Sequence, residues 1–250
     1  RGRGHGLATH LDRYHIREDL TIFQNQEELH SVLLSGGQTK RWLGEFFDVS
    51  VPVKVYQQIQ EHCGDNPFST RSNPARLMAV DWVSSQGFLV TVPKECKDIL
   101  QSSLLESGLQ DSTDEMINYL RLQQGWPLGN DIPEKTLPQE VGLNARAISL
   151  TKGCYLGQET VARLDALGHV NRRLVVLAVE KGGSMVVGDS VASNDEVVSR
   201  VTSVGCLGNQ AVSLAMTIIP LKSMQQKSNL TVAGKAANVV SPVLLDTLMT

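Results

Sequence analysis

The sequence has no long hydrophobic run and almost no charge imbalance. No stretch reaches the roughly eighteen uninterrupted apolar residues that a membrane-spanning helix needs. The formal net charge at pH 7 is only −3, and the opening Arg1-Gly2-Arg3-Gly4 carries just two positive charges. A nucleic-acid-binding surface needs a much stronger positive field. We therefore predict that the partners include neither nucleic acid nor membrane.

Cysteine is scarce and widely spaced. The four cysteines are Cys63, Cys96, Cys154 and Cys206, and no Cys-x-x-Cys occurs. In a chain of this length such spacing favours free thiols in a reducing compartment over a disulfide framework. The histidines do not have the spacing of metal ligands either, so the sequence predicts no metal site.

The composition is that of an ordinary globular protein. Hydrophobic residues make up 41% of the chain and charged residues 20%. A chain of 250 residues can form one large domain or two smaller ones. It begins at Arg1 rather than at a methionine, so we expect the sequence to start inside a longer gene product.

Apolar runs separated by glycine predict alternating strands and helices in the first half. The predicted strands are 20–23, 29–34, 76–83 and 87–92, and the predicted helices are 39–47, 94–106 and 112–124. Strand, glycine turn and helix in succession is typical of an α/β unit. Ser112 and Glu115 have the spacing of an N-cap box that would begin the last of these helices.

The chain changes character twice after this region. Residues 125–138 are rich in glycine and proline, and we expect an ordered loop that is anchored by Trp126, Ile132 and Leu137. From Arg172 onward the pattern predicts short β-branched strands at 173–179, 184–187, 196–203, 210–219 and 229–240. Several short strands without a long helix indicate a small β-barrel or sandwich, with a domain boundary near Gly168.

The segment 151–159 has the residues for thiol chemistry. Gly153 and Gly157 flank Cys154 and permit a tight loop, and the helix-forming run 158–167 follows. A thiol at its ordinary pKa is only about 3% thiolate at neutral pH, and a helix N-terminus or an ammonium group such as that of Lys152 favours ionisation. The alternative is that Cys154 is a buried packing residue, which is the more common case for a free cysteine. No histidine close in sequence supports a Cys–His hydrolase.

One eight-residue motif adds a resemblance to this interpretation. Lys-Gly-Cys-Tyr-Leu-Gly-Gln-Glu at 152–159 resembles the signature of the YgfZ-type proteins, the iron–sulfur-maturation branch of the aminomethyltransferase superfamily. The flanking segments that follow the same family pattern are 11–14, 17–19, 121–127, 132–143, 161–163 and 168–174. The resemblance covers most of the chain and is strongest from Arg121 to Leu174.

The resemblance implies both a fold and a function. The expected fold is α+β: an N-terminally incomplete folate-binding α/β domain in residues 1–168, followed by a small C-terminal β-barrel in residues 169–250. The implied cofactor is tetrahydrofolate, and the implied partners are iron–sulfur enzymes or assembly proteins. The expected function is to support iron–sulfur cluster assembly or repair through the motif cysteine. The expected location is the bacterial cytoplasm, or a mitochondrial or plastid matrix in a eukaryote.

The resemblance also assigns site residues. Cys154 and Lys152 are the catalytic candidates, and the candidates for cofactor binding are Arg121, Gln123, Tyr155, Gln158 and Glu159. Gln123 stands where the family often has a glutamate, so it offers an amide in place of a charge. Each of these residues also has a plainer interpretation: a solvated lysine, a packed tyrosine, a helix cap or a surface arginine.

Two other functions stay open. One is a folate-dependent aminomethyltransferase of the glycine-cleavage type, whose members commonly lack the motif cysteine. The other is a non-catalytic folate-binding module. Whether the protein is an enzyme with a transferase-like activity is therefore undecided at this point.

Overall fold

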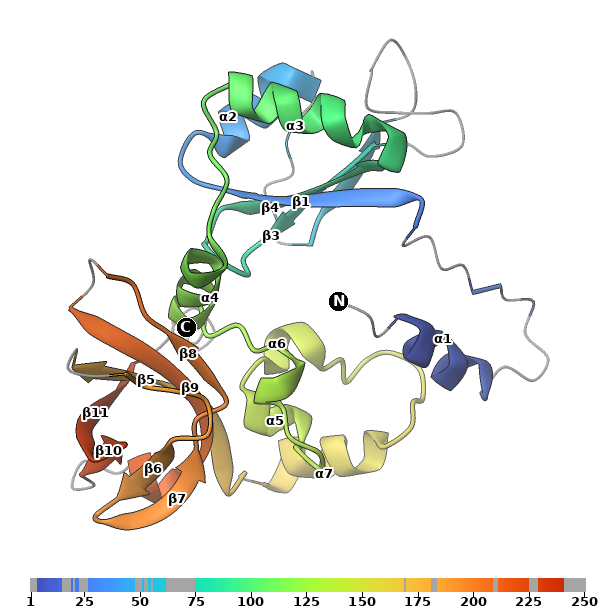
Figure 1. Cartoon of the computed structure of the whole chain (residues 1–250). Helices are drawn as coiled ribbons and strands as arrows, with labels where there is room; N and C mark the ends of the chain where they lie inside the picture. Colours follow the sequence, from blue (N-terminus) through green and yellow to red (C-terminus); the bar gives the residue numbers. More distant parts are fainter. Residues whose placement is uncertain are drawn as a thin grey trace. The chain divides into compact units, whose positions relative to one another are not determined.

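The computed structural model describes residues 4–14, 19, 21–22, 27–47, 51, 54, 56–61, 75–168, 170–180, 184–208, 211–224 and 229–240 (Figure 1). The chain divides into two compact units. Residues 1–81 and 86–111 form the first unit, and residues 82–85 and 112–250 form the second. No helix in the described part of the chain is both long and apolar enough to cross a membrane.

The first unit contains a four-stranded antiparallel sheet. Its elements are α1 (Gly4–Asp12), β1 (Leu29–Ser35), α2 (Thr39–Phe47), β2 (Gln58–Glu61), β3 (Ala75–Val80), β4 (Gly87–Pro93), η1 (Lys94–Cys96) and α3 (Lys97–Glu106). The strand order is β1-β4-β3-β2. In Figure 1, α2 and α3 lie over one face of this sheet. Leu43 of α2, Leu100 of α3 and Val90 of β4 are fully buried in the same apolar core, which holds the layers together.

Most of the predicted elements of this unit are confirmed. The helix at 39–47, the hairpin of β3 and β4 and the helical run from Lys94 to Glu106 are all present. The strand predicted at 20–23 is not seen at Thr21 and Ile22, and its other two residues lie outside the described part of the chain.

The second unit opens with helices. They are α4 (Asp114–Gln123), η2 (Gly129–Asp131), α5 (Pro138–Val141), α6 (Asn144–Ala147) and α7 (Gln158–Leu167). The predicted cap of α4 is wrong by one residue. Thr113, and not Ser112, is the N-cap, because its Oγ1 accepts a hydrogen bond of 3.2 Å from the Met116 backbone N–H.

A curled seven-stranded antiparallel sheet follows these helices. Its strands are β5 (Arg172–Glu180), β6 (Ser190–Ser193), β7 (Glu196–Arg200), β8 (Ser203–Gly205), β9 (Val212–Pro220), β10 (Leu230–Val232) and β11 (Lys235–Val240). The order is β7-β6-β10-β11-β5-β9-β8. The sheet curls back on itself, since the hydroxyls of Ser199 in β7 and Thr217 in β9 lie 2.7 Å apart. This confirms the barrel-like C-terminal region and, with it, the α+β class.

The barrel is apolar on both faces of β5 and β9. Because side chains alternate along a strand, Val175, Leu177 and Val179 face one apolar cluster and Leu174 and Val176 face another. The second cluster also contains Tyr119 and Leu122. Helix α4 therefore packs on the outside of the barrel wall.

The details of the barrel differ from the prediction in two places. The run 184–187 is a loop, and β6, which was not predicted, follows it at Ser190–Ser193. The run 229–240 divides into β10 and β11, and the strand predicted at 196–203 ends at Arg200, with β8 beginning at Ser203. The domain boundary predicted near Gly168 falls inside the second unit, between α7 and β5, and stays a prediction.

Candidate functional site

Cys154 lies on a loop directly before helix α7. The helix begins at Gln158, and its N-cap is Gly157, whose φ of +85° is a left-handed conformation that favours glycine. The Cys154 thiol is free and exposed. The alternative that Cys154 is a buried packing residue is therefore wrong.

Short contacts hold this loop in shape. The Lys152 backbone N–H donates to Ser149 Oγ at 3.2 Å, and the Tyr155 backbone N–H donates to Gln158 Oε1 at 3.3 Å. The Gln158 backbone N–H donates back to the Tyr155 carbonyl at 3.2 Å. The Lys152 ammonium lies 4.5 Å from the centroid of the Tyr155 ring, a cation–π distance. Gln158 thus supports the loop that carries Cys154.

Glu159 is exposed in the first turn of α7. A carboxylate at this place interacts favourably with the positive end of the helix dipole. The structure thus gives Lys152, Tyr155, Gln158 and Glu159 a place beside the thiol. Their predicted contacts with a substrate or cofactor stay predictions.

Helix α7 is anchored through α5. The Gln139 side chain donates from Nε2 to the Val161 carbonyl at 3.0 Å, and Val161 is buried. Glu140 Oε1 lies 2.8 Å from Arg172 Nε, so the same short helix is tied to the start of β5. This hydrogen bond raises the pKa of Arg172. The segment 137–140 therefore connects α7 to the barrel through side-chain contacts.

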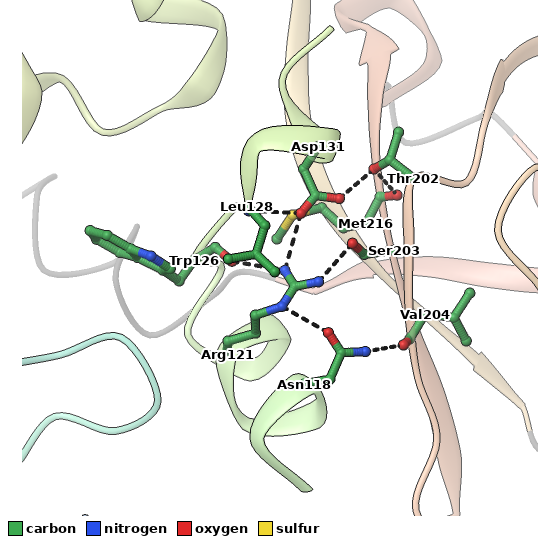
Figure 2. Close-up of polar contacts among 9 residues, drawn as sticks. All are labelled: Asn118, Arg121, Trp126, Leu128, Asp131, Thr202, Ser203, Val204 and Met216. Atoms are coloured by element: carbon green, nitrogen blue, oxygen red, sulfur yellow. Dashed lines mark hydrogen bonds and ion pairs between the residues drawn. The ribbon is translucent and has the colours of Figure 1, made fainter. Parts of the chain in front are cut away.

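Arg121 belongs to a buried polar network (Figure 2). Its Nε donates to Asn118 Oδ1 at 2.8 Å, its Nη1 to Asp131 Oδ2 at 3.1 Å and to the Trp126 carbonyl at 3.0 Å, and its Nη2 to Ser203 Oγ at 2.6 Å. Burial lowers the pKa of Arg121, and the adjacent Asp131 carboxylate opposes this shift. All three guanidinium nitrogens therefore have protein acceptors.

Asp131 is the acceptor at the centre of that network. It is fully buried, and it also accepts hydrogen bonds from the Leu128 backbone N–H at 2.9 Å and from Thr202 Oγ1 at 2.7 Å. Figure 2 shows Asn118 bridging in the same way from α4 to the Val204 carbonyl of β8. The network therefore fastens α4 and η2 to the barrel. Asp131, Thr202 and Ser203 were not among the predicted site residues.

The end of α4 carries a second group of polar and aromatic residues. Gln123 is exposed, and the ring of Trp126 lies 5.9 Å from that of Trp82 at an interplanar angle of 31°. Trp82 Nε1 and Gln124 Oε1 are buried, and neither has a hydrogen-bond partner within the described part of the chain. Among the described residues, these atoms are a buried donor on one indole of the pair and a buried acceptor two positions before the other in sequence.

The two groups of predicted residues are not directly linked. Between described residues, no hydrogen bond or ion pair joins the loop of Cys154 to Arg121 or Gln123. Nor do the described residues contain a cluster of histidine, cysteine and carboxylate side chains that could hold a metal ion.

Comparison with known proteins places the chain among related sequences. No family model matches it. It is 29% identical over 236 residues to an aminomethyltransferase of Nostoc, a match that covers 92% of this chain and 59% of that protein. It is 48% identical over 62 residues to the tRNA-modifying protein YgfZ of Colwellia psychrerythraea, covering 24% of this chain and 19% of that protein. A YgfZ of Yersinia enterocolitica is 27% identical over 205 residues, covering 76% of this chain and 57% of that protein.

A solved structure shows the same fold. The glycine cleavage system aminomethyltransferase T of Bartonella henselae superposes with a TM-score of 0.68 at 19% identity, over 87% of this chain and 59% of that one. The chain thus spans less than two thirds of each of these proteins. The chain is thus similar in sequence both to YgfZ proteins and to aminomethyltransferases, which confirms the predicted resemblance, and it shares the fold of an aminomethyltransferase.

Proposed function

We propose that the protein is a tetrahydrofolate-binding factor that supports iron–sulfur cluster assembly or repair through Cys154. The observation that carries the proposal is the exposed thiol on a glycine-flanked loop before α7. The resemblance of residues 152–159 to the YgfZ signature supports the same function. The partners would be iron–sulfur enzymes or assembly proteins, in a bacterial cytoplasm or in an organelle matrix. The names of the YgfZ relatives refer to tRNA modification, but the net charge of −3 still predicts no nucleic-acid partner here.

The loop suits an attacking or metal-binding sulfur. A thiol reacts through its thiolate, which needs access to solvent and a nearby positive potential. Cys154 is exposed, Lys152 is two residues away, and the N-terminus of α7 begins four residues later. Thiolate sulfur is also a soft ligand that suits iron–sulfur clusters.

The residues at the end of α4 fit a pterin-like ring better than Arg121 does. The Arg121 guanidinium already donates to four protein acceptors. In contrast, Trp82 Nε1 and Gln124 Oε1 are a donor and an acceptor that have no hydrogen-bond partner in the described part of the chain. The exposed Gln123 directly precedes Gln124 in sequence, and Trp126, whose ring pairs with that of Trp82, follows it by two positions. These residues would hold tetrahydrofolate by stacking and hydrogen bonding. The bound cofactor would supply one-carbon chemistry.

The test of the thiol compares Cys154→Ala with Cys206→Ala. Cys206 is a matched control because it is also free and exposed, and its Sγ lies 3.1 Å from Ser213 Oγ. The assay is the activity of an iron–sulfur enzyme in cells that depend on the gene, together with a melting curve for each variant. We expect loss of support with Cys154→Ala alone and unchanged melting for both. An equal loss in both variants would mean that the cysteines act through folding.

Folate binding has its own test. Titration calorimetry with tetrahydrofolate measures the affinity of the wild-type protein and of Gln123→Glu. A charged hydrogen bond contributes roughly 1.5–3 kcal/mol, so the variant should bind about tenfold tighter or more. Tighter binding would support the placement of the ligand at the end of α4. Equal affinities would show that the ligand does not contact residue 123.

A second candidate function is aminomethyl transfer. The 236-residue match to an aminomethyltransferase favours it. This function does not require the motif cysteine, so Cys154→Ala would then keep full transfer activity on a lipoyl-bound aminomethyl group. A third candidate, a non-catalytic folate-binding module, would bind tetrahydrofolate and show no dependence on Cys154 in either assay.

A further inference from the structure

Helix α7, which follows the Cys154 loop (residues 150–157), has little apolar anchorage of its own. Among its described side chains only Val161 is buried, while Gln158 and Leu164 are half-buried and the others are exposed. A surface helix is normally fixed by an apolar stripe of three to four residues in every two turns. The placement of α7 on the rest of its unit therefore depends on polar contacts as well.

One such contact comes from Gln139 of α5. Its Nε2 donates to the Val161 carbonyl at 3.0 Å, at the end of the first turn of α7. A carbonyl inside a helix accepts a hydrogen bond from the N–H four residues later, and its second lone pair can accept from another donor. The bond from Gln139 is therefore not needed to form the helix. It fixes where the helix lies.

The two ends of this bond belong to different parts of the unit. On the side of Gln139, Glu140 Oε1 lies 2.8 Å from Arg172 Nε of β5, and Val141 packs against the apolar cluster of the barrel wall. On the other side, Tyr155 and Gln158 exchange hydrogen bonds of 3.3 and 3.2 Å, which join the Cys154 loop to the first turn of α7. A contact that fixes α7 on the barrel therefore fixes the thiol as well.

Gln139 is an unfavourable residue at this place if packing is its only task. Its side chain is buried, and its Oε1 has no hydrogen-bond partner among the described residues. A buried acceptor without a partner destabilises the folded state, and a methionine would fill a similar space without one. What the amide adds is the bond to α7. Conflicts of this kind between a local choice and stability are expected where a residue serves function.

We propose that Gln139 is a positioning residue for Cys154, which holds α7 and the Cys154 loop in one place on the barrel. The proposal rests on the proposed function, because it assumes a reaction of the thiol for which this place matters. Gln139 itself contacts neither substrate nor cofactor in this role and acts through α7. A displacement of about 1 Å at a reacting group can cost about a hundredfold in rate, so a bond that fixes the loop has a large effect.

The chain carries its own reporters of this placement. Cys154 lies on the loop, Cys206 directly follows β8 of the barrel, and both thiols are free and exposed. Cys96 is buried, and Cys63, which lies outside the described residues, is removed by Cys63→Ser. Nitroxide labels on Cys154 and Cys206 then give the distribution of the distance between loop and barrel by double electron–electron resonance.

The test compares Gln139→Met with Thr136→Val. Methionine keeps the length of the side chain and removes the amide. Thr136→Val is a matched control, because it removes a similar bond from a side chain to a carbonyl, from Thr136 Oγ1 to Pro133 at 2.6 Å. We expect Gln139→Met to broaden the distance distribution and to lower the support of an iron–sulfur enzyme in cells by about tenfold or more. Thr136→Val should match the wild type in both measurements, and both variants should melt within about 4 °C of it.

Each other result has a definite meaning. A distribution as narrow in Gln139→Met as in the wild type would overturn the proposal, because the bond would then not fix the loop. Full support with Gln139→Met, beside loss with Cys154→Ala, would overturn it and leave the proposed function standing. A melting temperature lowered by more than about 4 °C would assign Gln139 to stability and overturn its positioning role. Retained support with Cys154→Ala would overturn the proposed function, and the distances would still decide whether Gln139 positions the loop.

Discussion

Asp131→Asn should lower the stability of the second unit much more than the small change in side-chain size suggests. The side chain is fully buried, and its two oxygens accept hydrogen bonds from Arg121, Leu128 and Thr202. The amide keeps the shape but removes the negative charge. Arg121 is buried too, and although burial lowers its pKa it stays protonated at neutral pH. The variant therefore leaves a positive charge buried without its counter-ion.

The size of the effect follows from the 3.1 Å between Arg121 Nη1 and Asp131 Oδ2. At an effective dielectric constant of about 20, two unit charges at this separation attract by about 5 kcal/mol. Removal of one partner of a buried pair costs about 3–5 kcal/mol in measured cases. We expect the free energy of unfolding to fall by that amount, which is a large fraction of the roughly 5–15 kcal/mol of a typical domain. Urea denaturation followed by circular dichroism measures it.

Glu140→Gln provides the matched control. It makes the same change of carboxylate to amide in an ion pair of 2.8 Å, but Arg172 on the other side is 41% exposed. Water screens that charge, so the loss should be about 1 kcal/mol or less from the ion pair itself. Equal losses in the two variants would refute the argument from burial. The double variant Arg121→Met/Asp131→Leu should recover much of the stability, because it leaves neither charge unpaired.

Two other variants test the packing of the helices. Gly205→Ala should destabilise the second unit by about 1–3 kcal/mol, because a Cβ there would lie 2.8 Å from Leu122 Cδ1 and 3.0 Å from Tyr119 Cα; wild-type melting would show that α4 can move away from β8. Burial raises the pKa of the Cys96 thiol, because the folded protein disfavours the thiolate. The stabilisation from the buried neutral thiol is therefore fully present below the ordinary thiol pKa of about 8.5, and it is lost as the pH rises through the raised pKa of the folded state. Cys96→Ala should therefore lessen the loss of stability between pH 8 and pH 10, as measured by melting curves; an unchanged alkaline loss would contradict this.

The sequence predicted the elements whose signals are local. Helix α2 follows a turn that contains Gly36 and Gly37, and the hairpin of β3 and β4 has alternating apolar residues on both sides of a short turn. The run 184–187 shows the limit of such signals. It is β-branched in part, but Val186 and Val187 are exposed in a loop, and the strand forms a few residues later at Ser190–Ser193. Tertiary contacts decide which short run pairs in the sheet.

The buried network could not have been predicted in the same way. An arginine on an amphipathic helix is normally a surface residue, and the Ser203 that binds Arg121 lies 82 positions away in sequence. Asp131 is only ten positions away, but it lies in a glycine-rich and proline-rich segment. The sequence of such a segment does not indicate which side chains point into the protein. Long-range polar contacts of this kind leave no periodic pattern.

The same network changes how loss of function in the motif segments should be interpreted. The segment 121–127 and the loop of Cys154 both resemble the family signature, but the structure gives them different tasks. Arg121 fastens α4 to β8, whereas Cys154 presents its thiol to solvent. An Arg121 variant that no longer binds tetrahydrofolate would therefore not identify a ligand contact. Asp131→Asn provides the comparison, since it disturbs the same anchor and leaves the guanidinium in place. If both variants lose folate in proportion to their loss of stability, Arg121 positions the site, and only a loss confined to Arg121 would assign it to the ligand.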